Sequence, residues 1–358
     1  MLRVLLALMA LPVFSVWAAN APAKLPTNGA VILQYHHVSD KTPAVTSVTP
    51  AQFREQMAYL ADNHFNVVPL SEVVKAIEEQ RALPAKTVAI TFDDGYRSIG
   101  RAASPILKEY GFPYTLFVAV EPIDKHYHDM MSWAQLRELV AQGAEIANHS
   151  WAHEHLNRRL AGETEQQWLA RVENNILKAE QRISDETGQN WKMLAYPYGE
   201  YNSQLQAMLK QHGFIAFGQQ SGAAGVYSDL TALPRFPVAG PYADLKTLKV
   251  KMHSLNMPVL KQNTSNPELS QGHWRPELRV TLDMSDINPK QLMCFVQGQG
   301  AKKPTWLSAN EFSIQADRDL PSGRTRYNCT APSKSRGQYY WFSQPWLRPN
   351  DNGQWLRE

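Results

Sequence analysis

The sequence has only two cysteines among its 358 residues, Cys294 and Cys329, and both lie near the C-terminus. In an exported protein, an even pair of cysteines favours a disulfide. The loop closed by this disulfide would staple only the last segment of the chain. The cysteines therefore give no information about chemistry earlier in the sequence.

An excess of charge of one sign is also absent. The formal net charge is +3, with basic and acidic residues mixed along the chain. This net charge is too small to indicate a nucleic-acid partner, and we expect none. Aromatic residues make up 10% of the chain and include 10 tryptophans. Their faces suit stacking against sugars, although a core would also take up many of them.

The apolar run near the N-terminus, residues 4–11, is too short to span a bilayer. It follows a basic start, and Val16-Trp17-Ala18 supplies the small residues of a cleavage site. We expect residues 1–18 to be a secretory signal peptide cut after residue 18 or 19. This predicts a periplasmic or secreted protein with no stable membrane span. The alternative is an uncleaved anchor.

From about residue 29 to 255, short apolar segments alternate with amphipathic ones. This alternation predicts an α/β fold with a parallel sheet or barrel, in which the loops after the strand C-termini carry function. We expect strands at 30–36, 66–70, 87–92, 113–119, 144–148, 193–197, 214–217 and 235–239, and helices near 50–62, 71–80, 100–110, 133–142, 163–186, 202–212 and 243–253.

A polar, turn-rich run at 261–267 is typical of a linker, and helical periodicity is absent beyond it. We therefore expect an N-terminal domain at 24–258 and a small all-β domain at 272–358 that is stapled by the disulfide. Trp306, Trp341 and Trp346 would form either the core of this small domain or a platform for sugars.

Two adjacent carboxylates mark the end of one predicted strand, in Thr91-Phe92-Asp93-Asp94-Gly95. On extended backbone Asp93 and Asp94 point in different directions, so one can bind a metal while the other accepts a proton. Gly95 then allows a sharp turn. Taken alone, an Asp-Asp-Gly sequence is also a common surface turn.

Two histidines follow about 55 residues later, in Asn148-His149-Ser150-Trp151-Ala152-His153. A spacing of four places His149 and His153 on one face of a helical turn, where they can share a divalent cation. Asp94 would complete the ligand set and leave positions open for water and substrate. His155 lies off that face and is expected to be exposed to solvent.

Together with Tyr196-Pro197-Tyr198-Gly199, these motifs resemble those of the polysaccharide deacetylases, also called the NodB-homology or carbohydrate esterase family 4 proteins. The resemblance covers roughly residues 29–255. It implies an irregular (β/α) barrel of the NodB type, with a metal at the strand C-termini and a polysaccharide as the substrate.

By position, the resemblance assigns Asp94, His149 and His153 as ligands of one divalent metal ion. Zinc is the first expectation, and Ni, Co or Fe also suit the ligands. The resemblance further implies that Asp93 is the general base and that the backbone N–H of Tyr198 helps hold the oxyanion. Further substrate-binding residues are expected in the same motifs and before the last strand, namely Tyr196, Pro197 and Arg235.

The sequence departs from the family pattern in two places. Ala195 stands where the family has an arginine that orients the base, and no late Leu-x-His supplies the general acid. Both departures are similar to the PgaB/IcaB branch, the poly-β-1,6-N-acetylglucosamine N-deacetylases, which is circularly permuted. The resemblance then implies that His36 is the acid, whereas His253 is a poor substitute. The alternative for His36 is a packed core histidine, and for Arg235 a purely structural ion pair.

These features predict an exported, metal-dependent deacetylase that removes N-acetyl groups from a GlcNAc-containing polysaccharide, with poly-β-1,6-GlcNAc ahead of chitin oligomers, peptidoglycan and acetylated xylan. A second hypothesis is a carbohydrate-binding protein with a degenerate site, which the missing arginine would permit. A third is a metal phosphoesterase, although that activity would normally need more ligands and a basic residue that cradles the phosphate.

Overall fold

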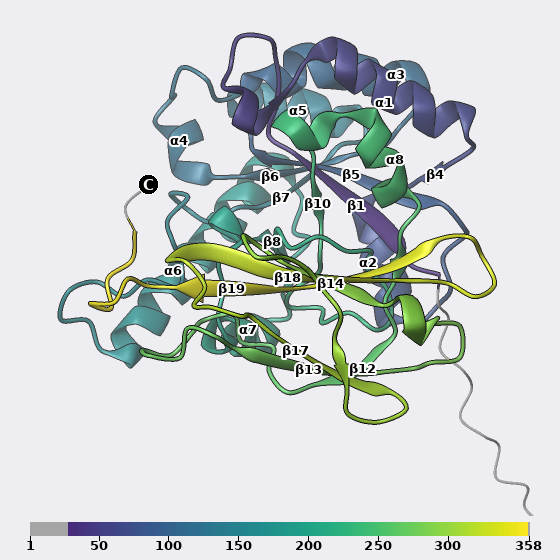
Figure 1. The fold of residues 1–358 in the computed structure, drawn as a ribbon. Helices are drawn as coiled ribbons and strands as arrows, with labels where there is room; N and C mark the ends of the chain where they lie inside the picture. The colour runs from purple at the N-terminus through teal and green to yellow at the C-terminus, as the bar shows by residue number, and fades with distance from the viewer. Residues whose placement is uncertain (1–27, 357–358) are drawn as a thin grey trace, which may run out of the picture.

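A computed structural model describes residues 28–356 of the chain. Its main sheet is parallel throughout and curls into a half-barrel (Figure 1). In spatial order its strands are β10 (Phe236–Pro237), β1 (Ala30–Tyr35), β5 (Thr87–Asp94), β6 (Thr115–Val118), β7 (Glu145–Asn148), β8 (Met193–Ala195) and β9 (Ile215–Phe217), and β4 (Asn66–Val67) pairs with the start of β5.

Helices connect these strands and cover the sheet, as the alternating pattern predicts. Three of them begin with a capping box, in which Thr49, Ser132 or Thr164 exchanges hydrogen bonds with a glutamine three residues later. The α-helices are α1 (Pro50–Asp62), α2 (Leu70–Glu78), α3 (Ser104–Tyr110), α4 (Val120–Asp124), α5 (Trp133–Ala141), α6 (Glu165–Thr187), α7 (Ser203–Gln211) and α8 (Leu245–Met252). Shorter elements are β2 (His37–Val38), β3 (Ser47–Val48), the π-helix η2 (Ile99–Ala103) and the 3₁₀ turns η1 (Ala44–Thr46), η3 (Pro197–Gly199), η4 (Gly240–Ala243) and η5 (Pro289–Gln291).

The register of the parallel strands aligns their carboxyl ends along one rim. Asp94 lies opposite Val118, and Asn148 lies opposite both Val118 and Leu194. Every residue of β5 is buried, which explains why an apolar run delivers two acids to this rim. The structure thus confirms the predicted α/β fold and gathers the loops that follow β5, β7 and β8.

The C-terminal part, which we define as residues 255–356, consists of two sheets that pack face to face around one apolar core. Cys294 and Cys329 lie directly opposite each other in β14 and β18 and form the predicted disulfide. Trp346 is in this core, whereas Trp341 packs edge-on against Phe236 of the N-terminal part, with 5.3 Å between ring centroids. One sheet has the order β11 (Leu255–Asn256), β19 (Tyr339–Arg348), β18 (Gly323–Pro332), β14 (Met293–Val296) and β15 (Gly300–Lys302), and the other β12 (Val259–Gln262), β13 (Glu277–Leu282), β17 (Glu311–Gln315) and β16 (Thr305–Trp306).

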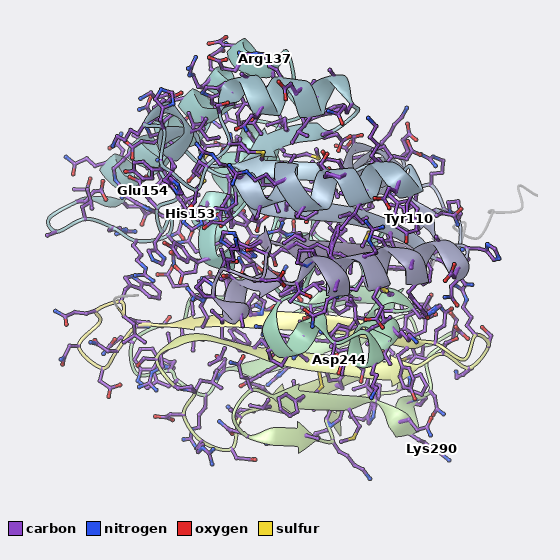
Figure 2. The ribbon with its side chains drawn as sticks, turned by 90° about the horizontal axis from the view of Figure 1, so that it is seen from above. Tyr110, Arg137, His153, Glu154, Asp244 and Lys290 are labelled. Atoms are coloured by element: carbon purple, nitrogen blue, oxygen red, sulfur yellow. A yellow bond between two sulfur atoms is a disulfide. The ribbon has the colours of Figure 1, made fainter. Side chains whose placement is uncertain are left out.

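The two parts lie against each other along β18 and β19, the long yellow strands of Figure 1. In Figure 2, Arg137 and Lys290 lie at opposite ends of the molecule, and His153 lies between them. Strand β12 includes Lys261 and Gln262, so the expected linker is wrong at its start, because this segment pairs with β13.

The predicted signal peptide lies outside the described residues. Within residues 28–356, no helix has the length and apolar character needed to cross a membrane.

Candidate active site and metal centre

The adjacent carboxylates of β5 turn to different partners. Asp93 is fully buried and faces Arg235, whereas Asp94 faces two histidines. Asp94 has a positive φ of 75°, and Gly95 follows with a φ of 90°. A side chain at Gly95 would be strained by this backbone and would also crowd Val118. The turn therefore fixes the direction of the Asp94 carboxylate.

His149 and His153 lie beside Asp94. The Nε2 atom of each imidazole is 3.2 Å from Oδ1 of Asp94, and the possible ligand atoms of the three residues all lie within 4.8 Å of one another. The sequence thus identified residues that the fold brings together. Among residues 28–356, this is the only group of three or more His, Cys, Asp or Glu side chains that lie close enough together to hold a metal ion.

The expected helical turn between the two histidines is wrong. Ser150 and His153 have positive φ values of 69° and 55°, and the segment is a loop after β7. Asn148 Oδ1 accepts a hydrogen bond from the Ser150 N–H, and Ser150 Oγ accepts one from the His153 N–H. The side chain of Asn148 also donates to Glu180 of α6, which anchors the loop to that helix. A compact polar loop therefore achieves the spacing that a helix was expected to provide.

The donor set fits a divalent cation. The buried atoms Asp94 Oδ1 and His149 Nε2 have no hydrogen-bond partner among the described residues, although they are close together. His149 donates from Nδ1 to the carbonyl of Ala195 at 2.8 Å, which leaves the lone pair of Nε2 facing Asp94. Two imidazoles and one carboxylate are a ligand set that transition metals accept, with positions left for water and substrate.

The surroundings favour the metal-binding protonation states of His153 and Asp94. Burial and the neighbouring His149 lower the pKa of His153 to about 4, so that its imidazole is neutral at neutral pH. Burial alone would raise the pKa of Asp94. The adjacent imidazoles of His149, His36 and His153 outweigh this effect and lower it. Burial would lower the pKa of His149, but its contact with Asp94 and the charge of Asp93 outweigh burial and raise it.

Asp93 is held by a buried arginine. Arg235, just before β10, donates from its two terminal nitrogens to the two carboxylate oxygens at 2.7 and 2.8 Å. Gln34 of β1 donates a further hydrogen bond to Asp93 at 2.6 Å. Burial would raise the pKa of Asp93, but the charges of Arg235 and His149 and the hydrogen bonds from Arg235 together outweigh burial and lower it. The inference that no arginine orients this aspartate is therefore wrong, because Arg235 supplies the guanidinium that Ala195 lacks.

The expectation that Tyr196, Pro197 and Arg235 bind substrate also needs correction, because all three are buried. The guanidinium of Arg235 is fully enclosed and donates to the carbonyl of Gly218 as well as to Asp93. Tyr196 donates its hydroxyl to the carbonyl of Thr231, inside the core. These residues support the site from within and present no surface to a ligand.

Tyr198 lies at the cluster with a positive φ of 60°. Its ring packs against His153, with centroids 4.6 Å apart, and stacks on His155 at 3.8 Å. His155 was expected to be exposed, and this is wrong, because it also contacts Glu200 at 2.7 Å. The part of the Tyr198 N–H in holding an oxyanion stays a prediction.

His36 follows β1 and is partly buried at the same rim. Its charge acts on both Asp93 and Asp94 and contributes to their lowered pKa values. His253 contacts Tyr59 and lies near Lys86, which precedes the start of β5, so it is at the opposite end of the sheet. Sequence reasoning missed Tyr96, which hydrogen-bonds Asp94 and stacks on His37 at 3.7 Å.

Comparison with known proteins agrees with this geometry. Residues 80–217 match the polysaccharide deacetylase family. The poly-beta-1,6-N-acetyl-D-glucosamine N-deacetylase of Escherichia coli K12 is 27% identical over 253 residues, which cover 60% of this chain and 37% of that protein. The enzyme of the same name from Staphylococcus epidermidis is 27% identical over 239 residues, covering 62% of this chain and 82% of that protein. The structure of IcaB from Ammonifex degensii superposes with a TM-score of 0.56 at 22% identity, over 64% of this chain and 99% of that chain.

The chain therefore contains a polysaccharide deacetylase domain, a member of a family of hydrolases. The likeness to IcaB shows the fold. The chain spans little more than a third of the E. coli relative, so the substrate and partners of that protein do not carry over directly to this chain.

We expect His149→Ala to lose its bound metal, because one of three ligands is removed, whereas Asp93→Asn should keep a near-stoichiometric ion. Metal content per chain, measured by mass spectrometry after dialysis, checks both variants. Loss of metal from Asp93→Asn would mean that the roles of the two aspartates are exchanged.

Replacing Arg235 with Met should destabilise the fold by about 3–5 kcal/mol, because it leaves the Asp93 carboxylate buried without a cation. The double variant Arg235→Met/Asp93→Asn should recover most of this loss, since no charge then stays buried. Urea unfolding of the wild type, both single variants and the double variant measures the coupling. Strictly additive losses would contradict a direct ion pair.

Proposed function

We propose that this protein is an exported, metal-dependent N-deacetylase of a GlcNAc-containing polysaccharide, with poly-β-1,6-GlcNAc as the preferred substrate. The observation that carries the proposal is the buried Asp93–Arg235 pair directly beside the Asp94, His149 and His153 cluster. The substrate is suggested by the names of the E. coli and S. epidermidis relatives. Export is proposed from the signal-like N-terminus.

Asp94, His149 and His153 would hold the metal, which would act as a Lewis acid and lower the pKa of a water molecule. Asp93 would take the proton of the attacking water, and Arg235 and Gln34 hold its carboxylate in place. The Tyr198 N–H donates to the oxyanion. His36 then protonates the nitrogen as the C–N bond breaks, which releases acetate and a free amine.

The alternative functions have less support. A degenerate binding protein was suggested by the missing arginine, and Arg235 removes that reason. A phosphoesterase would need a basic residue to cradle phosphate, but the guanidinium of Arg235 is enclosed and already paired with Asp93. Chitin oligomers, peptidoglycan and acetylated xylan stay as alternative substrates.

The test is the release of amines from synthetic β-1,6 and β-1,4 GlcNAc oligomers of equal length, with chelator and with added metal. We expect metal-dependent release that is faster on the β-1,6 series. Acetylated xylan oligomers, with acetate release as the readout, serve as the third substrate. Faster release from the β-1,4 series would overturn the linkage, and no release from any oligomer by the metal-loaded protein would overturn the deacetylase proposal.

His36→Ala should lower kcat by roughly 10²–10⁴, the range for a lost general acid, because the leaving amine then departs without a proton. The control is His253→Ala, which changes a histidine at the far end of the sheet and should leave kcat unchanged. Steady-state kinetics at saturating metal measure both. A near-normal kcat for His36→Ala would remove His36 from the mechanism and with it the permuted-branch assignment.

A further inference from the structure

The C-terminal part reaches the candidate active site at one buried carboxylate, that of Glu200. Arg324 of β18 donates to its Oε1 atom at 3.0 Å, and Arg158, in the loop that follows β7, lies 3.3 Å from the same oxygen. His155 of that loop contacts the other oxygen at 2.7 Å. Arg158 also donates to the carbonyl of Leu356, near the end of the described chain, at 2.9 Å. Glu200 therefore joins two segments of the C-terminal part to the rim.

The Glu200 carboxylate is ionised at neutral pH in this place. Burial would raise its pKa, but the hydrogen bond with His155 and the charges of His155, Arg158 and Arg324 outweigh burial and lower it. If Arg324 is replaced, His155 and Arg158 still contact the carboxylate, so no buried charge is left without a partner. A change at Arg324 therefore tests the link between the two parts at a small cost to the fold.

Tyr198 lies beside this carboxylate in a backbone conformation that needs support. Its φ is 60° and that of Gly199 is 69°, so two residues in a row are left-handed. This conformation costs free energy for a residue that has a side chain. The Tyr198 ring stacks on His155 at 3.8 Å with the planes 10° apart, and the Arg324 guanidinium carbon lies 5.6 Å from the ring centroid. Two of the side chains that bond Glu200 therefore also hold the ring of Tyr198.

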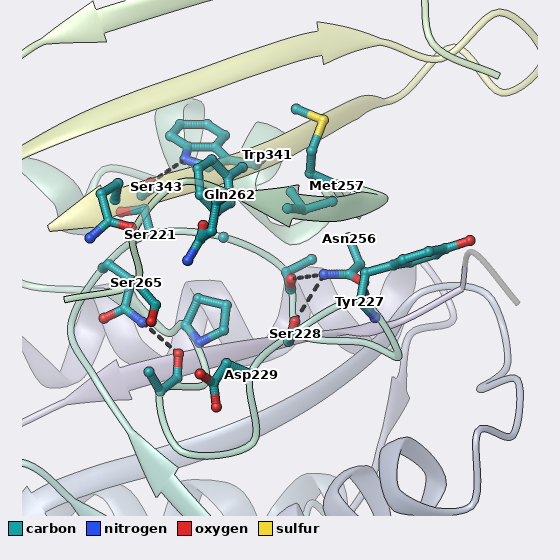
Figure 3. A pocket seen from close by; sticks show the side chains of 18 of the residues that line it. Ser221, Tyr227, Ser228, Asp229, Asn256, Met257, Gln262, Ser265, Trp341 and Ser343 are labelled. Carbon is teal, nitrogen blue, oxygen red and sulfur yellow. Dashed lines mark hydrogen bonds between the residues drawn. The ribbon is translucent and has the colours of Figure 1, made fainter. Parts of the chain in front are cut away.

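The packing between the two parts is interrupted next to this loop. A cavity of about 410 Å³ lies between them, lined by Tyr201 of the N-terminal part and by Gln262 and Trp341 of the C-terminal part, among others (Figure 3). Tyr201 closely follows Tyr198 in the sequence, so the cavity begins beside the same loop. Individual side chains such as Arg324 therefore hold the loop here in place of continuous packing.

We propose that Arg324 is a positioning residue for deacetylation, which acts through the Tyr198 ring to hold the backbone N–H of Tyr198 toward the oxyanion. The proposal rests on the proposed function, in which that N–H donates to the oxyanion. Because Arg324 belongs to β18, the C-terminal part takes part in the chemistry of the N-terminal part.

The proposal has a kinetic signature. A donor that serves the oxyanion stabilises the transition state and not the bound substrate, because the oxyanion forms only as the water attacks. Loosening Tyr198 should therefore lower kcat and leave KM nearly unchanged. A residue that contacts the bound sugar would instead change KM.

The test compares Arg324→Met and Arg324→Lys in the metal-loaded full chain, on the GlcNAc oligomer that the wild type deacetylates fastest. We expect Arg324→Met to lower kcat by roughly 10-fold with KM within about 2-fold of the wild type, a smaller loss than the roughly 10²–10³ for removing an oxyanion donor. Arg324→Lys keeps a charge beside Glu200 and should recover part of kcat. A wild-type kcat for Arg324→Met would overturn the proposal, and so would a raised KM at constant kcat.

Hydrogen exchange in the peptide that covers residues 196–202, followed by mass spectrometry without substrate, measures the support of Tyr198 independently of turnover. We expect faster exchange in Arg324→Met than in the wild type and an unchanged metal content per chain. Unchanged exchange would contradict the proposal. Loss of metal would place the effect on the metal cluster and would also contradict it.

The matched control is Arg279→Met on β13, in the other sheet of the C-terminal part, because the Arg279 guanidinium pairs with Glu277 of the same strand at the surface. Its kcat, KM and exchange should equal those of the wild type, and urea unfolding midpoints check that each variant is folded. If the wild type releases no amine from any oligomer, the proposed function fails, and the exchange measurement still decides whether Arg324 holds Tyr198.

Discussion

The buried ion pair between Asp93 and Arg235 is the interaction on which the rest of the site depends. Asp93 is the second-last residue of β5, Arg235 precedes β10, and β1 lies between these strands in the sheet. Gln34 of β1 donates to the same carboxylate, so three neighbouring segments meet at one buried charge. A buried carboxylate without its cation is strongly destabilising. The strand order that closes this side of the half-barrel therefore depends on the same ion pair that keeps Asp93, the proposed base, ionised.

Several residues near the Asp93 carboxylate have a strained backbone conformation. Asp94, Ser150, His153 and Tyr198 all have positive φ values, a conformation that costs residues with side chains some free energy. Hydrogen bonds from Asn148 and Ser150 hold the histidine loop in this form. These hydrogen bonds restrict the loop that carries the two histidines, which lowers the cost of ordering these ligands on binding.

The sequence predicted the alternation of strands and helices and the residues of the metal cluster, because both depend on short-range patterns. The sequence could not predict the ion pair between Arg235 and Asp93, since 142 residues separate the two and only the strand order brings them together. A spacing of four residues suggested a helical turn at His149 and His153, but a loop with two positive φ values gives the same proximity. Tyr196 lies in a motif associated with the site, yet motif membership does not reveal that its side chain points into the core.

Glu200 links the C-terminal part to the rim of the candidate active site. It is almost fully buried, and three cationic or potentially cationic side chains meet on it, from His155, Arg158 and Arg324. His155 and Arg324 both contact the Tyr198 ring, and only Arg324 belongs to β18. Removing the C-terminal part would leave Glu200 with fewer partners and the ring of Tyr198 without its cation. The small β-sandwich is thus a structural component of the site, because it holds in place the residue that is expected to present an N–H to the oxyanion.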